Sequence, residues 1–153
     1  MKQQPMERVQ APIRRYRLRV DAERCHGCQS CMVACSLVHE GQALPSRARI
    51  QVVVDPFEGE HLIRACRQCR RAPCAQACPN EAIRWVEEGE YWVVDADRCD
   101  GCGACAAACP FEAILLVAQE GAIRALKCDT CAGQPACVAS CPRAALIWQE
   151  VIP

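Results

Sequence analysis

Apolar and polar residues alternate along several short segments of this 153-residue chain. Alternation with a period of two predicts half-buried β-strands, and a turn rich in glycine or acidic residues between two such segments predicts a hairpin. Three hairpins are predicted on this basis, with strands at residues 49–54 and 61–64, 83–86 and 91–94, and 114–117 and 122–126. Two further strands are predicted near the ends of the chain, at residues 16–20 and 146–151.

Few large side chains are available to fill a core behind these strands. Aromatic residues make up 5% of the chain, whereas cysteine occurs 16 times. The 18 Lys and Arg balance the 18 Asp and Glu, which argues against a general binder of nucleic acid or of anionic membranes. Because neither a secretory signal nor an apolar run of about 18–20 residues is apparent, we expect a cytoplasmic protein without direct membrane insertion. With so few aromatic side chains, the sixteen cysteines must organise the interior.

All sixteen cysteines fall into four quartets of similar spacing. They are Cys25, Cys28, Cys31 and Cys35; Cys66, Cys69, Cys74 and Cys78; Cys99, Cys102, Cys105 and Cys109; and Cys128, Cys131, Cys137 and Cys141. The first and third quartets have the C-x2-C-x2-C-x3-C spacing of bacterial [4Fe–4S] ferredoxins. The second and fourth have two and three residues inserted before the third cysteine, and proline follows the last cysteine of every quartet except the first.

Three uses of so many cysteines compete. Disulfides need an oxidising compartment, and structural zinc sites use two cysteine pairs separated by a longer spacer. The spacing favours iron–sulfur clusters, because three cysteines of one loop can surround one cluster while the fourth reaches the neighbouring cluster. We expect the fourth cysteine to enter a short helix, with the following proline in its first turn. The sequence thus predicts four [4Fe–4S] clusters.

Two connectivities of the quartets are compatible with this spacing. If the two end strands pair, the first quartet lies beside the fourth, and the second and third form a module inserted between them. Exchange of the fourth cysteine then gives four ligand sets: Cys25, Cys28, Cys31 and Cys141; Cys35, Cys128, Cys131 and Cys137; Cys66, Cys69, Cys74 and Cys109; and Cys78, Cys99, Cys102 and Cys105. In the alternative, the first quartet pairs with the second and the third with the fourth.

The nested connectivity predicts an α+β fold of two pseudo-symmetric dicluster ferredoxin-like modules, one inserted in the other, with short hairpins and loop-bound clusters. The outer module would comprise residues 16–48 and 119–153, and the inserted module residues 49–118. Residues 1–15 would form an N-terminal arm that contacts a partner.

The four quartets, in this order and with these insertions, resemble the iron–sulfur subunits of molybdenum and tungsten oxidoreductases, including dimethyl-sulfoxide reductase β-subunits. The resemblance spans roughly residues 16–148 and implies the first-with-fourth pairing. Because Cys102 is present, it also implies four complete cubanes. After the first quartet, residues 34–41 (ACSLVHEG), Pro45 and residues 47–50 look like the small polyferredoxin subunits of tungsten aldehyde oxidoreductases. In the first quartet, Ser36 stands where the Cys-Pro pattern has proline. The resemblance therefore does not predict the shape of the protein wall beside the cluster of that quartet.

The resemblance implies a non-catalytic subunit that relays single electrons from a large catalytic subunit, with a tungsten or molybdenum pterin, to an acceptor. The acceptor would be a flavin- or NAD-binding subunit or a soluble ferredoxin, and further copies of the chain are another possible neighbour. No G-x-G-x-x-G loop is present, and His26, His39 and His61 lack metal-ligand spacing. The alternatives are an electron-transfer partner of a CO dehydrogenase, hydrogenase or formate dehydrogenase, and a scaffold protein stapled by metal.

Two arginine-rich segments have two interpretations each. They are Arg14, Arg15, Arg17 and Arg19, at and just before the first strand, and Arg67, Arg70 and Arg71 in the second quartet. The first group is either a solvated strand edge or a partner contact. The second is either a solvated loop or a functional group that raises the potential of a cluster or attracts an acidic partner. The three tryptophans are expected to serve packing.

Overall fold

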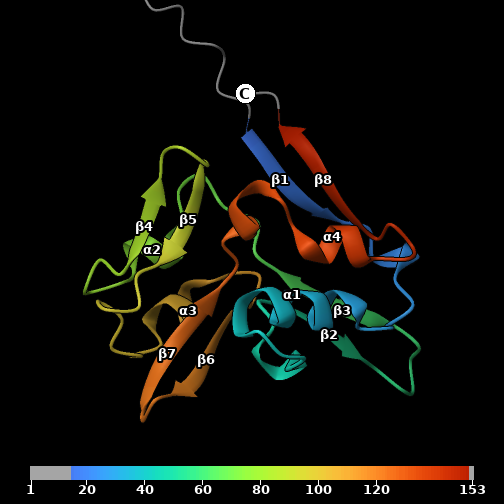
Figure 1. Cartoon of the computed structure of the whole chain (residues 1–153), viewed down its shortest axis with the longest axis horizontal. Coiled ribbons are helices and arrows are strands. Elements are labelled where there is room, and N and C mark those ends of the chain that lie inside the picture. The colour runs from blue at the N-terminus through green and yellow to red at the C-terminus, as the bar shows by residue number, and fades with distance from the viewer. Residues whose placement is uncertain (1–14, 152–153) are drawn as a thin grey trace, which may run out of the picture.

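The computed structural model describes residues 15–151, in which eight strands form four antiparallel pairs (Figure 1). The strands are β1 (Arg15–Val20), β2 (Ile50–Val54), β3 (His61–Ala65), β4 (Ile83–Val86), β5 (Tyr91–Val94), β6 (Ile114–Gln119), β7 (Ala122–Lys127) and β8 (Leu146–Val151). The helices are α1 (Ser30–Glu40), α2 (Pro73–Gln76), α3 (Ala104–Ala108) and α4 (Ala136–Ser140), with short 3-10 turns at Ala22–Arg24, Pro45–Arg47 and Thr130–Gly133. The predicted N-terminal arm, except Arg15, lies outside the described residues.

Strand pairing follows the sequence-based prediction. β2–β3, β4–β5 and β6–β7 are the three predicted hairpins, so that prediction is confirmed. β1 pairs with β8, with Val20 opposite Leu146 and Arg15 opposite Val151. The pairing of the two end strands, on which the nested connectivity depends, is therefore present.

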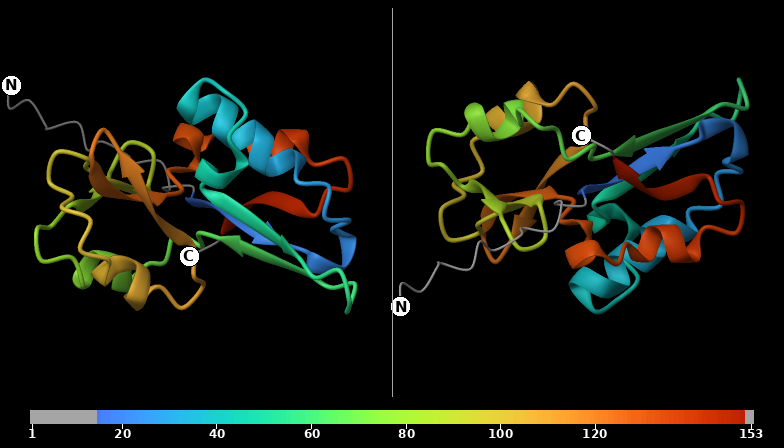
Figure 2. Two further views of the ribbon diagram at one scale, coloured as in Figure 1. Left: turned by 90° about the horizontal axis from the view of Figure 1, so that it is seen from below. Right: turned by 90° about the horizontal axis from the view of Figure 1, so that it is seen from above.

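Two hydrophobic cores lie in two halves of the molecule (Figure 2). One core includes Leu18 of β1, Met32 of α1 and Leu146 of β8, together with residues of β2, β3 and α4. The other includes Ile83 of β4 and Ile114 of β6, together with residues of α2, α3 and β7. Each half thus buries the apolar faces of two strand pairs beneath two helices.

These cores do not divide the chain at the expected module boundaries. The β2–β3 hairpin lies within residues 49–118 of the sequence, yet it packs into the core that contains β1 and β8. β7 lies beyond residue 118, yet Ala125 packs into the other core. The expected boundaries and the cores differ because a hairpin packs on the quartet that lies nearest to it in space. That quartet need not belong to the module in which the sequence places the hairpin.

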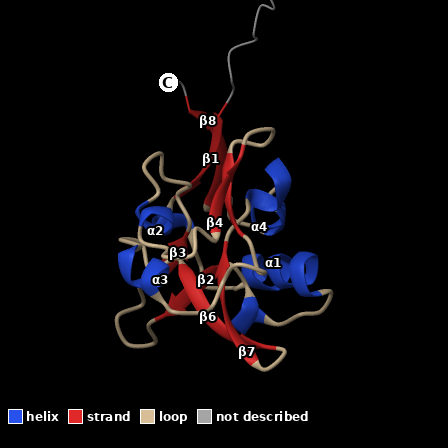
Figure 3. Cartoon of the chain, turned by 90° about the vertical axis from the view of Figure 1, so that its left-hand side faces the viewer, coloured by secondary structure: helices blue, strands red, loops and turns tan. Residues whose placement is uncertain are grey.

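Helices lie outside the strands, with α2 and α3 on one side and α1 and α4 on the other (Figure 3). The predicted position of the short helices was wrong for the last three quartets, although Cys35 of the first quartet lies within α1. Cys109 and Cys141 are the C-caps of α3 and α4, so the helix precedes the closing cysteine and does not follow it. Pro110 and Pro142 come directly after these helix ends, where proline is common because it cannot continue a helix.

Antiparallel strand pairs with helices segregated from them make the fold α+β, as expected from the sequence. The longest helix of the described residues is α1, with 11 residues. Within residues 15–151, no helix combines the length and apolar character that crossing a membrane requires.

Candidate metal centres

Four cavities each contain a set of four cysteines that come from two quartets, and we number them sites 1 to 4. Site 1 contains Cys25, Cys28, Cys31 and Cys141. Site 2 contains Cys35, Cys128, Cys131 and Cys137. Site 3 contains Cys66, Cys69, Cys74 and Cys109, and site 4 contains Cys78, Cys99, Cys102 and Cys105. Cys66 also lines site 2, so sites 2 and 3 share a wall.

The structure thus brings together the same sets of cysteines that the nested connectivity predicts. In each of the four sites, three cysteines come from one quartet and the fourth is the closing cysteine of another quartet. The alternative connectivity would place Cys35 beside Cys69 and Cys74. Cys35 instead lines site 2 together with Cys137, against which it packs in the core.

Backbone N–H groups point at the first cysteine of every quartet. The bonds run from Gly27 N to Cys25 Sγ (3.4 Å), Gln68 N to Cys66 Sγ (3.4 Å), Thr130 N to Cys128 Sγ (3.3 Å) and Ala125 N to Cys99 Sγ (3.4 Å). Three donors lie two residues after their cysteine, whereas Ala125 reaches Cys99 from β7. Such donors stabilise negative charge on thiolate ligands and tune the potential of a cluster.

The closing cysteines of the last three quartets accept a hydrogen bond from an alanine four residues further on. These bonds run from Ala82 N to Cys78 Sγ (3.2 Å), Ala113 N to Cys109 Sγ (3.5 Å) and Ala145 N to Cys141 Sγ (3.3 Å). The residue before each alanine, which is Glu81, Glu112 or Ala144, has a left-handed backbone with φ of 49°. All three alanines are buried, so a larger side chain would not fit. The repeated Cys-Pro-x-x-Ala segment is therefore a turn that aims an N–H at the closing thiolate.

The first quartet closes differently because Ser36 stands where the other quartets have proline. α1 continues through Ser36, whose Oγ donates to Val33 O (2.9 Å) and accepts from Leu44 N (3.0 Å). The fully buried hydroxyl thereby fixes the segment that follows the helix. That segment leads to Arg49, whose N–H donates to Cys35 Sγ at 3.2 Å. A donor to the closing thiolate is thus retained, although it lies fourteen residues away.

Replacing Ser36 with alanine is expected to destabilise the protein by about 1–3 kcal/mol, because the Leu44 N–H loses its buried acceptor. The measurement is urea-induced loss of visible absorbance in the metal-loaded protein under argon. Ser46→Ala, at an exposed position, serves as the control and should leave the midpoint unchanged. Equal midpoints for the two variants would contradict the role given to Ser36.

The cysteine thiols themselves indicate what the sites can hold. Burial raises the pKa of Cys31 to about 11, and the neighbouring Cys141 adds to the shift. Burial likewise raises the pKa of Cys137 to about 12, with Cys35 adding to it. Buried thiolates such as those of Cys31 and Cys137 are stable only beside compensating positive charge, which metal ions supply through direct bonds. Four thiolates with N–H donors around them match the ligand chemistry of an iron–sulfur cluster.

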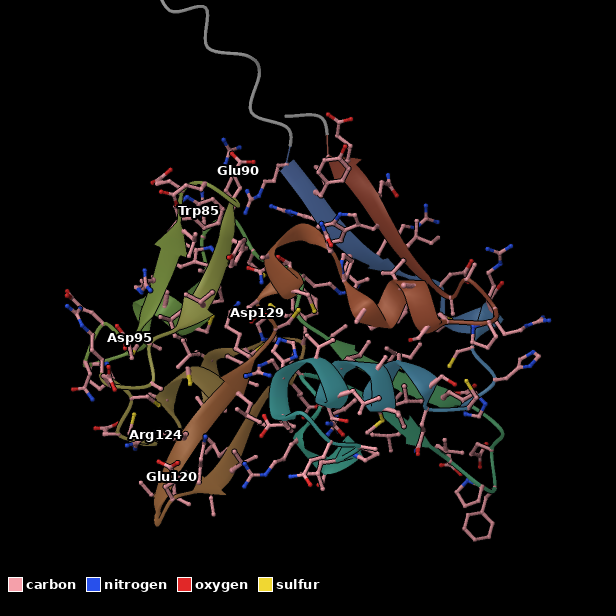
Figure 4. All side chains as sticks on the ribbon, in the orientation of Figure 1. Trp85, Glu90, Asp95, Glu120, Arg124 and Asp129 are labelled. Carbon is pink, nitrogen blue, oxygen red and sulfur yellow. The ribbon has the colours of Figure 1, made fainter. Side chains whose placement is uncertain are left out.

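His39 joins the first and fourth quartets beside site 2. Its Nδ1–H donates to Cys35 O (2.8 Å) and its Nε2–H donates to Asp129 Oδ1 (2.9 Å). The bond to Asp129 first, then the contact of Nδ1 with Cys35 Sγ (3.7 Å), and last the bond to Cys35 O raise the pKa of His39 to about 10, against the effect of burial. Burial opposes ionisation of Asp129, but the bonds from His39 and from Cys131 N lower its pKa to about 2. The charged pair therefore ties α1 to the loop of the fourth quartet, near the centre of the molecule (Figure 4).

Lys127 and Gln68 form a buried polar group between sites 2 and 3, at 4% and 2% exposure. Lys127 Nζ donates to Trp92 O (2.8 Å) and Cys128 O (3.1 Å). Gln68 donates from Nε2 to Cys128 O (2.7 Å), and its Oε1 accepts from Trp92 N (2.8 Å). Burial raises the pKa of Cys74 in site 3 and of Cys128 in site 2, and the positive charge of Lys127 opposes both shifts. Sequence reasoning missed this group, whose one signal is a lysine at the end of an apolar strand.

The tryptophans pack as expected. Trp85 and Trp92 face each other across the β4–β5 hairpin in an edge-to-face contact of 5.2 Å. Trp148 stacks on Tyr16 across the β1–β8 pair, with ring centroids 5.9 Å apart. His26 is exposed at the rim of site 1.

Comparison with known proteins decides which metal group these sites hold. Models of the 4Fe-4S dicluster domain match residues 65–113 and 91–142, and a model of the 4Fe-4S binding domain matches residues 22–38. The putative electron transport protein YsaA of Escherichia coli is 40% identical over 114 residues, which cover 70% of this chain and 70% of YsaA. The chain belongs to the 4Fe-4S dicluster family of electron-transfer proteins. With sixteen cysteines, this dicluster protein carries four [4Fe–4S] clusters.

Other relatives of this dicluster protein are subunits of larger enzymes. The polyferredoxin-like subunit of the aliphatic sulfonate oxidoreductase of Pyrococcus furiosus is 38% identical over 104 residues, covering 68% of this chain and 60% of the relative. A subunit of the tetrathionate reductase of Salmonella typhimurium is 36% identical over 109 residues, covering 67% of this chain and 43% of the relative. The chain thus spans from under half to about two thirds of the length of these curated relatives.

A similar solved structure supports the same fold. A chain of the BamBC active-site complex of benzoyl-coenzyme A reductase, determined with zinc, superimposes with a TM-score of 0.54 at 26% sequence identity. The superposition covers 92% of this dicluster protein and 81% of that chain.

Proposed function

We propose that this protein relays single electrons through clusters held at sites 1 to 4, between a catalytic subunit and an electron acceptor. The observation that carries the proposal is the grouping of all sixteen cysteines into four cavities with N–H donors at the thiols. A [4Fe–4S] cluster gains or loses one electron, at a potential set by burial, charge and hydrogen bonds to sulfur. Every cysteine is used for ligation in this proposal, so the chain itself is non-catalytic.

The proposed ligands of each cluster are the four cysteines that line its site, as given above. Each closing cysteine then ties two quartets together, first with fourth and second with third. The β1–β8 pair and the two separate cores support two nested modules of this kind. We place their division by these cores, so that β2 and β3 belong to the outer module and β7 to the inserted module.

The sites are proposed to act in the order 1, 2, 3, 4. Cys31 of site 1 and Cys137 of site 2 pack in the same core, and Cys66 lines both site 2 and site 3. Cys74 of site 3 and Cys105 of site 4 pack in the other core. The exposed cysteines, Cys28 and Cys102, belong to sites 1 and 4. The two end sites are therefore open to solvent, as electron exchange with partners requires.

The proposed partners are a large subunit with a tungsten or molybdenum pterin and an acceptor that is a flavin- or NAD-binding subunit or a soluble ferredoxin. Support comes from the relatives, which are named as subunits of a sulfonate oxidoreductase and a tetrathionate reductase. The similar BamBC chain points to the same kind of assembly, since it belongs to the active-site complex of a reductase.

Iron and sulfide analysis of the anaerobically purified protein tests the proposal. We expect about sixteen iron atoms and about sixteen sulfides per chain, because each cubane contributes four of each. After reduction with dithionite, the EPR spectrum should show several S = 1/2 signals broadened by interaction between neighbouring clusters. About four zinc ions per chain, with no such signals, would instead support the metal-stapled scaffold.

A further inference from the structure

A basic surface borders site 3. It is formed by Arg15, Arg17, Arg67 and Arg70, which we call the Arg patch. Arg67 lines the cavity of site 3, and its guanidinium lies 5.6 Å from the centre of the Phe111 ring at the cavity rim. Arg15 lies 5.2 Å from the centre of the Trp85 ring and donates to Gln68 O at 2.9 Å. Two segments distant in sequence, β1 and the loop of the second quartet, therefore contribute to one surface.

The charges of the Arg patch act on one another and on site 3. Burial lowers the pKa of Arg15, and the positive charges of Arg17 and Arg70 lower it further, whereas Glu90 opposes the shift. Glu90 lies at the tip of the β4–β5 hairpin, beside the start of β1 (Figure 4). Burial raises the pKa of the Cys69 thiol in site 3, and Arg17 counteracts the shift. The patch thus projects positive charge onto the thiols of this site.

Five arginines elsewhere in the described chain approach acidic side chains. Arg47 and Arg49 approach Glu40, Arg64 approaches Glu112, and Arg84 and Arg98 approach Asp95. Between residues 15 and 151, no ion pair within 4.0 Å engages any arginine of the Arg patch. Because the whole chain has a formal net charge of zero, the patch is a local excess of positive charge.

The segment that precedes the Arg patch in the sequence is not acidic. Residues 1–14 precede the patch in the sequence and contain Lys2, Arg8 and Arg14 against a single acidic residue, Glu7. Their net charge has the same sign as that of the patch. Charge complementarity therefore calls for a separate acidic partner.

We propose that the Arg patch docks the acidic face of an electron-transfer protein beside site 3. Complementary charge speeds encounter and orients the partner, and the effect weakens as salt increases. A docked partner in its oxidised form would gain the single electron that the cluster at site 3 loses, and the reverse exchange balances in the same way. The inference rests on the proposed function only in requiring a redox-active cluster at site 3. It goes beyond that function because site 3 is an inner site in the proposed order 1, 2, 3, 4. Electrons would then also enter or leave the relay at an inner cluster, and not at the two end clusters alone.

Two cobalt(III) oxidants of opposite charge test the docking surface on the full, cluster-loaded chain. The dithionite-reduced protein is mixed with the tris(oxalato) trianion or the hexaammine trication, and oxidation is followed by stopped-flow absorbance. In the double variant Arg17→Gln, Arg70→Gln, the rate constant with the trianion should fall about tenfold at low ionic strength. The rate with the trication should stay the same or rise. The variant Arg84→Gln, Arg124→Gln removes the same charge on β4 and β7, outside the Arg patch, and should change the trianion rate less than twofold.

Binding is measured separately with the redox-inert tris(oxalato)chromate(III) trianion, which broadens NMR signals of nearby protons. We expect broadening of the Trp85 indole signal in the native protein, its loss in the Arg17, Arg70 variant, and reversal by an acidic plant-type ferredoxin. Equal trianion rates in the two double variants would overturn the inference, as would reversal by a short polyphosphate without reversal by the ferredoxin. The inference would also be overturned if the Arg17, Arg70 variant changed the midpoint potentials of the clusters enough to account for the whole change in the trianion rate. Absence of iron from the protein would instead overturn the proposed function.

Discussion

Replacing Cys141 with alanine is expected to remove the cluster at site 1, whose other three cysteines lie more than 100 residues earlier in the chain. In the structure, Cys141 lines site 1 with Cys25, Cys28 and Cys31, and its charge acts on the Cys31 thiol. With one of its four ligands missing, the cluster is no longer held at every iron and is expected to dissociate, and the buried Cys31 thiolate then loses the charge that balances it. Iron content should fall from about sixteen to about twelve atoms per chain.

Double variants identify which cluster is lost. Cys28→Ala removes an exposed ligand of site 1, so adding it to Cys141→Ala should cause no further loss of iron. Cys131→Ala removes a ligand of site 2, and adding it to Cys141→Ala should remove about four more iron atoms. If the third quartet paired with the fourth instead, Cys141 would close the cluster of Cys99, Cys102 and Cys105. Cys141→Ala would then be additive with Cys28→Ala and silent beside Cys102→Ala, which would exclude the nested connectivity.

The strands and the four cysteine quartets could be predicted from sequence because each rests on local spacing, whereas the pairing of the quartets was implied by the resemblance and by the expected pairing of the end strands. Alternation with a period of two gave the strands, and the hydrogen-bonded hairpin at Ile83–Val86 and Tyr91–Val94 has the predicted bounds. Quartet spacing indicated the chemistry of the ligands. The helices were misplaced because proline after Cys109 and Cys141 was interpreted as a helix start, although proline is equally suited to follow a helix end.

Features that depend on contacts between distant segments had no such local signal. Arg49 donates to Cys35 only because α1 continues past Ser36 and the chain then returns. Lys127 reaches Trp92 and Gln68, which lie 35 and 59 residues away. The module boundaries failed to match the cores for the same reason, since a hairpin packs against its neighbour in space. The spacing of residues along the sequence thus predicts the contacts of buried charged and polar side chains less well than it predicts the strands and the cysteine quartets.

Replacing Lys127 with methionine is expected to destabilise the protein and to lower the potentials of the two central clusters. The ammonium is buried and donates to Trp92 O and Cys128 O, so its loss should cost about 1.5–3 kcal/mol of unfolding free energy. Its charge also opposes the pKa shifts that burial imposes on Cys74 in site 3 and Cys128 in site 2. A cation that stabilises thiolates also stabilises the added electron of a reduced cluster. With an effective dielectric constant of about 20, this interaction is on the order of 1–2 kcal/mol, or about 40–90 mV.

Potentiometric titration followed by EPR measures the second effect, and two further variants separate charge from packing. Lys127→Gln removes the charge but keeps a hydrogen-bond donor, so it should shift the potentials as far as Lys127→Met with a smaller loss of stability. Arg124→Gln removes the same charge from the same strand at a partly exposed position, where the guanidinium donates to the carbonyl of Ile123. Solvent screening should make its effect on the potentials much smaller. Because only two sites flank Lys127, the potentials of two of the four clusters should shift. An equal shift of all four potentials would show that Lys127 does not set the potentials of the central clusters. A shift of the same size in Arg124→Gln would show the same.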